Sequence, residues 1–151
     1  MTEKGNISVQ NPLKIERDIT LPNNIEDVPL LNDFIDSVCE ELTIDPAVTM
    51  SLNLAIEEAV VNVMQYAYPQ GTAGDVQVIA KADDHQLTFT LIDAGIPFDP
   101  TAMKEADITL SAEERPIGGL GIHLVREIMD AVSYNRKDDK NILTLTKNII
   151  S

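Results

Sequence analysis

The chain of 151 residues has a single cysteine, Cys39, so it cannot form an internal disulfide. It has no cysteine–histidine cluster and no Gly-x-Ser-x-Gly sequence, which leaves zinc chemistry and acyl transfer without support. No uninterrupted apolar stretch approaches the roughly 20 residues that span a bilayer, and the N-terminus lacks the apolar core of a signal peptide. These absences favour a cytoplasmic protein with no membrane partner.

Positive charge is missing from a large part of the chain. Between Arg17 and Lys81 there is no Lys or Arg, whereas the same stretch holds eleven Asp and Glu, and the net charge is −14. A surface of this kind repels nucleic acid and anionic lipid, so we expect no direct nucleic-acid partner. Either the acidic face only keeps the protein soluble, or it docks a basic patch of a protein partner. A phosphate ligand would need magnesium, backbone N–H groups and the few basic residues.

The pattern of apolar residues predicts an arm over residues 1–12 and one domain over residues 13–151. The expected elements are a strand over 13–21, a helix capped by Asn24 that runs through Leu42, a helix over 46–68 with Asp45 as its cap, strands over 76–81 and 87–91, a helix over 120–131, and a hairpin of 132–136 and 142–149. This order predicts an α+β fold, with helices on one face of a mostly antiparallel, mixed sheet. The stretch from 97 to 119 has no period and three prolines, which is typical of a functional lid or a mobile loop.

Two polar residues interrupt an apolar helical run at positions 54–64. Glu58 and Asn62 are four residues apart, so they lie on one face of the helix, one turn from each other. An Asn oxygen suits magnesium, and a carboxylate one turn away can orient water or accept a hydroxyl proton. The alternative is that both side chains simply bond to loop backbone.

Two further segments favour a nucleotide site. Asp93, at a strand end, can accept a hydrogen bond from an exocyclic amine such as that of adenine, and Gly95 lets a flat ring approach the backbone, although an ordinary Asp-Gly turn explains the same residues. The glycine-rich residues 118–121 open the next helix and present unpaired N–H groups to phosphate, unless they are only a flexible lead-in.

In this order, residues 58–62, 93–100 and 118–126 resemble the N, G1 and G2 boxes of the GHKL (Bergerat-fold) ATPases. Within that superfamily they are most similar to the bacterial anti-sigma factor serine/threonine kinases. The resemblance runs from about residue 25 to residue 149. It implies a Bergerat-type two-layer sandwich with ATP and Mg²⁺ as cofactors.

The resemblance also implies residue roles. Glu58 would be the general base, Asn62 the magnesium ligand, and Asp93 the acceptor of the adenine amine with Gly95 beside the ring. The phosphates would be bound by the remaining residues of the nucleotide set, which are Arg115, Gly119, Leu120 and Gly121. Two departures from the pattern stand out: Pro97 replaces the second glycine of the G1 box, and Tyr66 stands where several relatives have His.

The function implied is phosphorylation of a Ser or Thr on an antagonist protein with a STAS (anti-anti-sigma) fold, with a switch between that antagonist and a sigma factor. The alternative is a non-catalytic module that sequesters a partner according to its nucleotide state. The catalytic half of a sensor histidine kinase fits poorly, because nothing upstream resembles a phosphoacceptor helical hairpin. Relatives of this kind are often homodimers.

Overall fold

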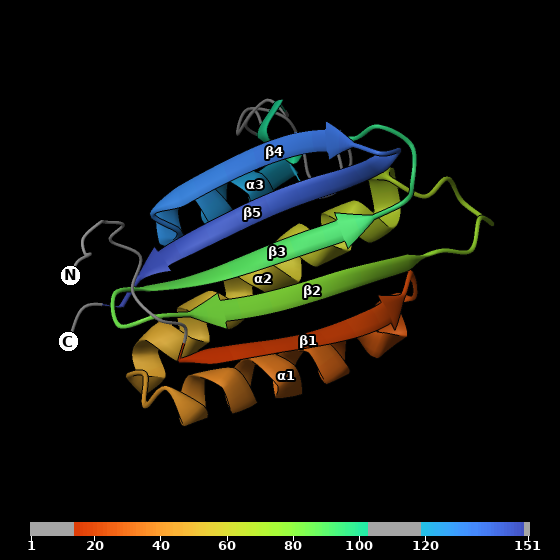
Figure 1. Ribbon diagram of the computed structural model, residues 1–151. Coiled ribbons are helices and arrows are strands. Elements are labelled where there is room, and N and C mark those ends of the chain that lie inside the picture. The colour runs from red at the N-terminus through yellow and green to blue at the C-terminus, as the bar shows by residue number, and fades with distance from the viewer. Residues whose placement is uncertain (1–13, 103–118, 150–151) are drawn as a thin grey trace, which may run out of the picture.

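The computed structural model describes residues 14–102 and 119–149 (Figure 1). In this part of the chain, the order of the main elements is as predicted: a strand, two helices, a hairpin, a helix and a second hairpin. The elements are β1 (Ile15–Pro22), the 3₁₀ helix η1 (Ile25–Asp27), α1 (Val28–Glu41), α2 (Pro46–Tyr66), β2 (Asp75–Ala82), β3 (Gln86–Asp93), the 3₁₀ helix η2 (Pro100–Ala102), α3 (Gly119–Ile128), β4 (Ala131–Lys137) and β5 (Lys140–Asn148).

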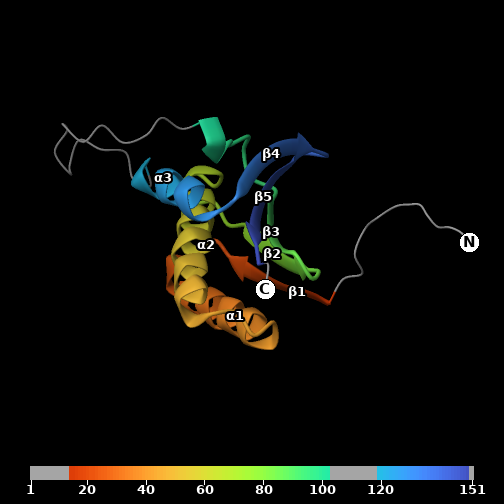
Figure 2. The same cartoon turned by 90° about the vertical axis from the view of Figure 1, so that its left-hand side faces the viewer.

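The five strands form one sheet in the order β1–β2–β3–β5–β4, and each neighbouring pair is antiparallel. The predicted α+β class is confirmed, but among the described strands the sheet is not mixed. The reason is that β5 lies between β3 and β4, so the two strands joined through α3 never pair directly. Figure 2 shows the helices together on one face of the sheet, which makes the fold a two-layer sandwich.

The core lies between the sheet and the helices. Alternate residues of β2 and β3 are buried, as the period-2 pattern predicts for a sheet covered on one face. Across the central pair, Phe89 is opposite Leu145 and Leu91 is opposite Leu143, and all four side chains are buried. Burying a side chain of this size stabilises the fold by about 1.5–3 kcal/mol, so these pairs hold the strand ends in register.

Helix α2 is the central helix of the second layer. Its start is as predicted: Pro46 is its first residue, and the Asp45 side chain accepts a hydrogen bond of 2.7 Å from the backbone N–H of Ala47. Among the described helices, α2 is the one that is long and apolar enough, by length and composition, to cross a membrane. Since it packs against both other helices and the sheet, and many of its side chains belong to the core, its apolar character is that of a core helix.

The first helix begins differently from the prediction. Asn24 caps the short η1, where its Oδ1 accepts a bond of 3.0 Å from the N–H of Glu26, and α1 begins only at Val28. Pro29 lacks a backbone N–H, which suits the first turn of a helix and not its interior, so the chain makes a separate turn before α1.

The last hairpin is tighter than predicted. Asp138 and Asp139 have positive φ angles of 55° and 63°, as in the two-residue turns that match the twist of paired strands. Strand β5 therefore begins at Lys140. The prediction that residues 137–141 form the turn is wrong for Lys137, which ends β4, and for Lys140 and Asn141, which begin β5. Asn141 lies inside the sheet opposite Asp93.

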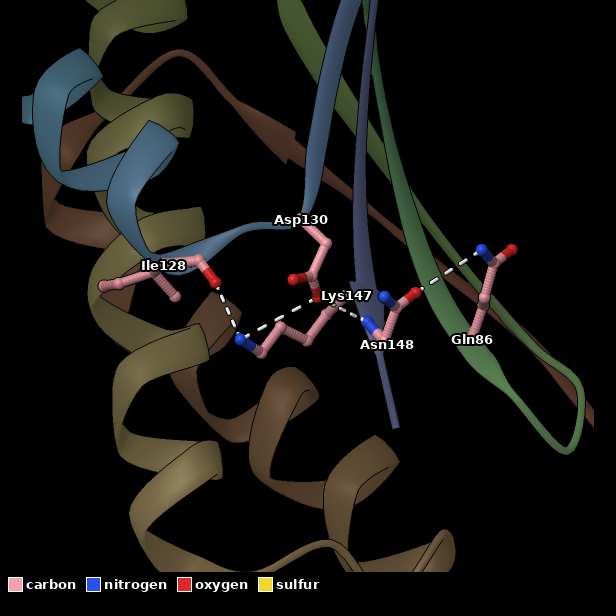
Figure 3. A network of polar contacts seen from close by, with 5 residues as sticks. All are labelled: Gln86, Ile128, Asp130, Lys147 and Asn148. Carbon is pink, nitrogen blue, oxygen red and sulfur yellow. Dashed lines mark hydrogen bonds and ion pairs between the residues drawn. The ribbon is translucent and has the colours of Figure 1, made fainter. Parts of the chain in front are cut away.

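The end of α3 is tied to the sheet by polar contacts (Figure 3). The Lys147 ammonium group donates to the carbonyl of Ile128 at 2.8 Å and lies 3.9 Å from the Asp130 carboxylate. Asp130 in turn accepts from the backbone N–H of Asn148 at 2.7 Å. A cation at the C-terminus of a helix is favourable because it faces the negative end of the helix dipole, so these contacts hold α3 in place above α2.

Candidate functional site

The face of α2 that carries Glu58 and Asn62 contains the least satisfied polar group of the described structure. Asn62 is fully buried, and neither its Nδ2 nor its Oδ1 has a hydrogen-bond partner among the described residues. Glu58, one turn earlier, is half-buried and makes no hydrogen bond there. The alternative that Asn62 bonds to loop backbone is not what the described residues show. An orphaned buried amide costs roughly 1–3 kcal/mol, so this side chain calls for a ligand.

Asp93 ends β3 and is 3% exposed. Its Oδ1 accepts two hydrogen bonds, at 2.8 Å from Asn141 Nδ2 and at 2.9 Å from the N–H of Gly95. Burial raises the pKa of the Asp93 carboxyl above its ordinary value, against the opposing effects of these two bonds and of the Arg136 charge. Because both bonds fall on Oδ1, Oδ2 is the atom that can accept from a ligand amine.

Asn141, which the sequence reading assigned to a turn, organises the surroundings of Asp93. Its Nδ2 donates to Asp93 and, also at 2.8 Å, to the carbonyl of Ile96. Its Oδ1 accepts from the N–H of Phe98 at 3.1 Å and from the Tyr134 hydroxyl. Asn141 thus uses both ends of its carboxamide to hold the residues that follow β3. The sequence held a signal for this position. Asn141 is two residues before Leu143 and four before Leu145, so in a strand its side chain lies on the same buried face as theirs.

Gly95 is required by a close backbone contact with α2, whereas the sequence suggested that it lets a flat ring approach the backbone. A Cβ at this position would lie 2.2 Å from the carbonyl oxygen of Ala67, so a side chain cannot fit against the end of α2. The next residue, Ile96, donates its N–H to the same Ala67 carbonyl at 2.8 Å. The guanidinium group of Arg136 donates through Nη1 to the carbonyl of Gly95 at 2.9 Å. The glycine is needed for the close approach of this loop to the helix, whatever ring lies beside it.

Two tyrosines at the end of α2 hold the same loop. The ring of Tyr66 stacks on Phe98, with ring centroids 5.3 Å apart, and burial raises the pKa of Tyr66. The Tyr68 hydroxyl donates to the carbonyl of Asp75 at 2.6 Å and accepts from the N–H of Ala94 at 3.1 Å. Tyr66, one of the two departures from the family pattern, therefore contacts the loop that carries the other, Pro97.

The glycine-rich segment is described from Gly119 onward. Gly119, Leu120 and Gly121 form the first turn of α3, which lies beside α2 (Figure 2). Farther along α3, Arg126 donates to the carbonyl of Thr101 in η2. The backbone N–H groups of a helix start are suited to phosphate. Of the predicted lid over residues 97–119, residues 103–118, which include Arg115, lie outside the described residues, and Pro100–Ala102 form η2.

The described structure places the predicted features on the face of α2, at the end of β3, where Asp93 is the buried last residue, and at the N-terminus of α3, which packs beside α2. A two-layer sandwich with these three features is an ATP-binding domain of the GHKL type, as the sequence predicted. Residues 21–147 match the family described as the histidine kinase-like ATPase domain. The chain belongs to this family.

Three similar proteins are named as protein kinases. Serine/threonine-protein kinase BtrW of Bordetella bronchiseptica is 30% identical over 98 residues, which cover 65% of this chain and 69% of the relative. Serine-protein kinase RsbW of Bacillus thuringiensis is 28% identical over 102 residues, covering 65% of this chain and 62% of the relative, and RsbW of Bacillus cereus matches to the same extent. The predicted class, a serine/threonine-protein kinase on a GHKL-type domain, is confirmed at this level of similarity.

Proposed function

We propose that this protein binds ATP with Mg²⁺ and transfers the γ-phosphoryl group to a Ser or Thr of an antagonist protein with a STAS fold, as an anti-sigma factor-type kinase. The observation that carries the proposal is the buried, unpartnered carboxamide of Asn62 with Glu58 one turn away. This pair sits on a family scaffold whose named relatives are serine and serine/threonine kinases.

Each residue of the site has a task in this proposal. Asp93 Oδ2 accepts from the adenine amine, while Asn141 holds Oδ1 in place. Asn62 Oδ1 is a hard, neutral oxygen of the kind that Mg²⁺ prefers, and one such ligand suffices because phosphates and water complete the magnesium shell. When bound, Mg²⁺ neutralises phosphate charge. Gly119, Leu120 and Gly121 offer backbone N–H groups to the phosphates, with Arg115 nearby in sequence.

Glu58 has the chemical task. The acceptor hydroxyl oxygen forms a bond to the γ-phosphorus while the bond from that phosphorus to the β–γ bridging oxygen breaks, and ADP leaves with the released electron pair. Glu58 takes the hydroxyl proton. The half-buried position of Glu58 and its lack of a described hydrogen-bond partner leave its carboxylate available as an acceptor.

The acidic surface supports a protein partner and opposes a nucleic-acid one. Asp33, Asp36 and Glu40 are exposed on α1, in the part of the chain that has no Lys or Arg. We place part of the partner surface there, for a basic patch of the antagonist or of a sigma factor. The proposal includes a cytoplasmic location, no membrane partner and a homodimer as the assembly.

Replacement of the base tests the kinase directly. Glu58→Gln should lower transfer from radiolabelled ATP to the antagonist by at least about 100-fold, the lower range for loss of a general base, with little change in nucleotide affinity. The antagonist is obtained by pull-down from the native cytoplasm with ATP against ADP. Glu57→Gln is the matched control, because Glu57 is the adjacent half-buried carboxylate and its side chain instead accepts from Asn32 at 3.2 Å.

A non-catalytic nucleotide switch is the second candidate, and the stacking of Tyr66 on Phe98 beside Pro97 is the feature that favours it. In that case wild-type protein would phosphorylate no antagonist, yet partners would still exchange between the ATP and ADP states. Absence of magnesium-dependent ATP or ADP binding in calorimetry would overturn both candidates.

A further inference from the structure

A cavity of about 760 Å³ lies at the end of α2 and is not formed by Glu58, Asn62 or Asp93. Its walls come from the start of η1, from the last turn of α2 and from the loop between α2 and β2. The lining residues are Asn23, Ile25, Met64, Gln65, Tyr66, Tyr68, Pro69, Gln70, Gly71, Thr72 and Ala73. Its volume is within the range of sites that hold small molecules.

The walls of this cavity are held by the protein itself. Asn23 makes three hydrogen bonds to the facing loop: its N–H donates to the carbonyl of Gly74 at 2.9 Å, its Nδ2 donates to the carbonyl of Thr72 at 2.8 Å, and its Oδ1 accepts from the N–H of Gly74 at 3.1 Å. The ring of Tyr68 lies so close to Gly74 that a Cβ there would be 2.1 Å from it. The cavity is therefore formed before any ligand binds.

The lining determines the kind of ligand. None of the lining side chains carries a charge, and Ile25, Met64 and the two tyrosines offer apolar and aromatic surface. Gln65 is one of the lining residues, and its Oε1 is buried with no hydrogen-bond partner among the described residues, so a ligand donor reaches this oxygen once the Gln65 side chain turns toward the cavity. A buried acceptor in this state is satisfied by an N–H or O–H donor.

We propose that this cavity is a second ligand site, which takes a small neutral molecule with a flat apolar body and an N–H donor directed at Gln65 Oε1. A flat ring can pack against Tyr66 and Tyr68, and the donor supplies the hydrogen bond that Gln65 lacks. An anion or a metal ion finds no charged side chain among the lining residues.

The site is linked to the loop after β3 through three consecutive residues. Tyr66 stacks on Phe98, the carbonyl of Ala67 accepts from Ile96, and the hydroxyl of Tyr68 accepts from Ala94. A ligand that favours this arrangement of the end of α2 also favours the arrangement of Asp93 and its loop. The site then regulates nucleotide affinity, and this coupling rests on the proposed function, whereas the site itself does not.

Indole and 1-methylindole form the test pair, because they share the flat apolar body and only indole has an N–H. Each is titrated into the full chain, without nucleotide, and followed by calorimetry and by the NMR signals of the lining residues. We expect saturable binding of both, with indole tighter by about three- to tenfold, the range for one net hydrogen bond. Absence of saturable binding at this cavity, or equal affinities for the two probes, overturns the proposal.

A variant at Gln65 tests whether Gln65 Oε1 is the atom that accepts from the N–H of the ligand. Gln65→Met keeps the length of the side chain and removes the oxygen, so indole and 1-methylindole should then bind equally. Gln86→Met, at an exposed position of β3 that does not line the cavity, should leave the preference for indole unchanged. A persistent preference in Gln65→Met would overturn the role of Gln65, and the comparison of the two probes on wild-type protein stands even if this variant does not fold.

The coupling is measured separately. Saturating indole should tighten ADP binding severalfold, and ADP should tighten indole binding by the same factor, as linkage requires. Indole binding with no effect on ADP overturns the regulatory part. If the protein binds indole and no nucleotide, the proposed function fails while the second site stands; if it binds ADP and not indole, only the second site fails.

Discussion

The two sides of the candidate nucleotide site differ in how their polar groups are satisfied. Beside Asp93, Asn141 makes four hydrogen bonds with both ends of its carboxamide, and Asp93 Oδ1 accepts two. On α2, Asn62 is just as deeply buried and makes none within the described structure. The first side is a built framework that exists before ligand, whereas the second is complete only when something binds to it. The side chain of Asn141 therefore stabilises the ligand-free fold, whereas that of Asn62 destabilises it.

The largest effect is expected at Asn141. Asn141→Leu has a similar shape but leaves the Ile96 carbonyl, the Phe98 N–H and the Tyr134 hydroxyl without their partner. Because each of these part-buried bonds contributes about 0.5–1.5 kcal/mol and the buried bond to Asp93 is lost as well, the variant should lose about 3 kcal/mol of unfolding free energy. Urea denaturation at neutral pH measures this. A loss below about 1 kcal/mol would mean that the framework around Asp93 does not depend on Asn141.

Gly95→Ala probes the same side of the site through sterics. The added Cβ would lie 2.2 Å from the Ala67 carbonyl oxygen, so the loop must move away from the end of α2. We expect a loss of about 1–3 kcal/mol, the range for overpacking, and weaker nucleotide binding because Asp93 moves with the loop. The control is Gly71→Ala, where no atom crowds the added Cβ and only the positive φ of 86° opposes the change.

Asn62→Leu tests the unsatisfied side of the site, on α2. Leucine removes the unsatisfied carboxamide and forms helix better than asparagine, so apo stability should rise by about 1 kcal/mol. Binding of magnesium nucleotide should be lost at the same time. Thermal unfolding with and without ADP and Mg²⁺ measures both effects. Destabilisation of the apo protein would show that Asn62 is satisfied in the free protein and that the two sides of the site do not differ.

Much of this contrast was readable from the sequence. The four-residue spacing of Glu58 and Asn62 in an apolar run predicted their shared face, and the alternation in residues 76–91 predicted two strands that place Asp93 at a strand end. Local periodicity suffices there because helices and strands repeat their burial every few residues. The cap at Asp45 followed from its side chain and the proline after it.

Asn141 and Gln65 were missed for a physical reason. Residues 137–141 are all polar, so composition suggests a five-residue turn, but two residues with positive φ suffice to close the hairpin and the remainder pairs in β4 and β5. Only the strand register, which depends on contacts far apart in sequence, places Asn141 opposite Asp93. Gln65 stands out only in the folded structure, where its Oε1 is buried without a partner among the described residues. Gly95 was recognised, but its reason, the closeness of Ala67, needed three dimensions.

The smallest effect on stability is expected from the charge of Asp93. Burial raises the pKa of this carboxyl from its ordinary 3.8, so the folded protein holds the proton more tightly than the unfolded chain does. The contribution of Asp93 to stability therefore declines as pH rises from about 3.8 through the folded pKa, and the cost of the buried charge is complete above it.

In Asp93→Asn, the new Oδ1 can still accept from Asn141 and from the Gly95 N–H, while the amide replaces the charged Oδ2. The stability of the variant relative to wild type should thus increase over this pH range and then level off, whereas Asp84→Asn, at an exposed carboxylate paired with Lys14, should show no such rise. Adenine nucleotide binding should fall about 10–100-fold in Asp93→Asn, because the amide offers a donor to the adenine amine. A variant that gains no stability with pH would show that the ionised Asp93 is compensated in the free protein, and the unsatisfied side of the site would then be limited to α2.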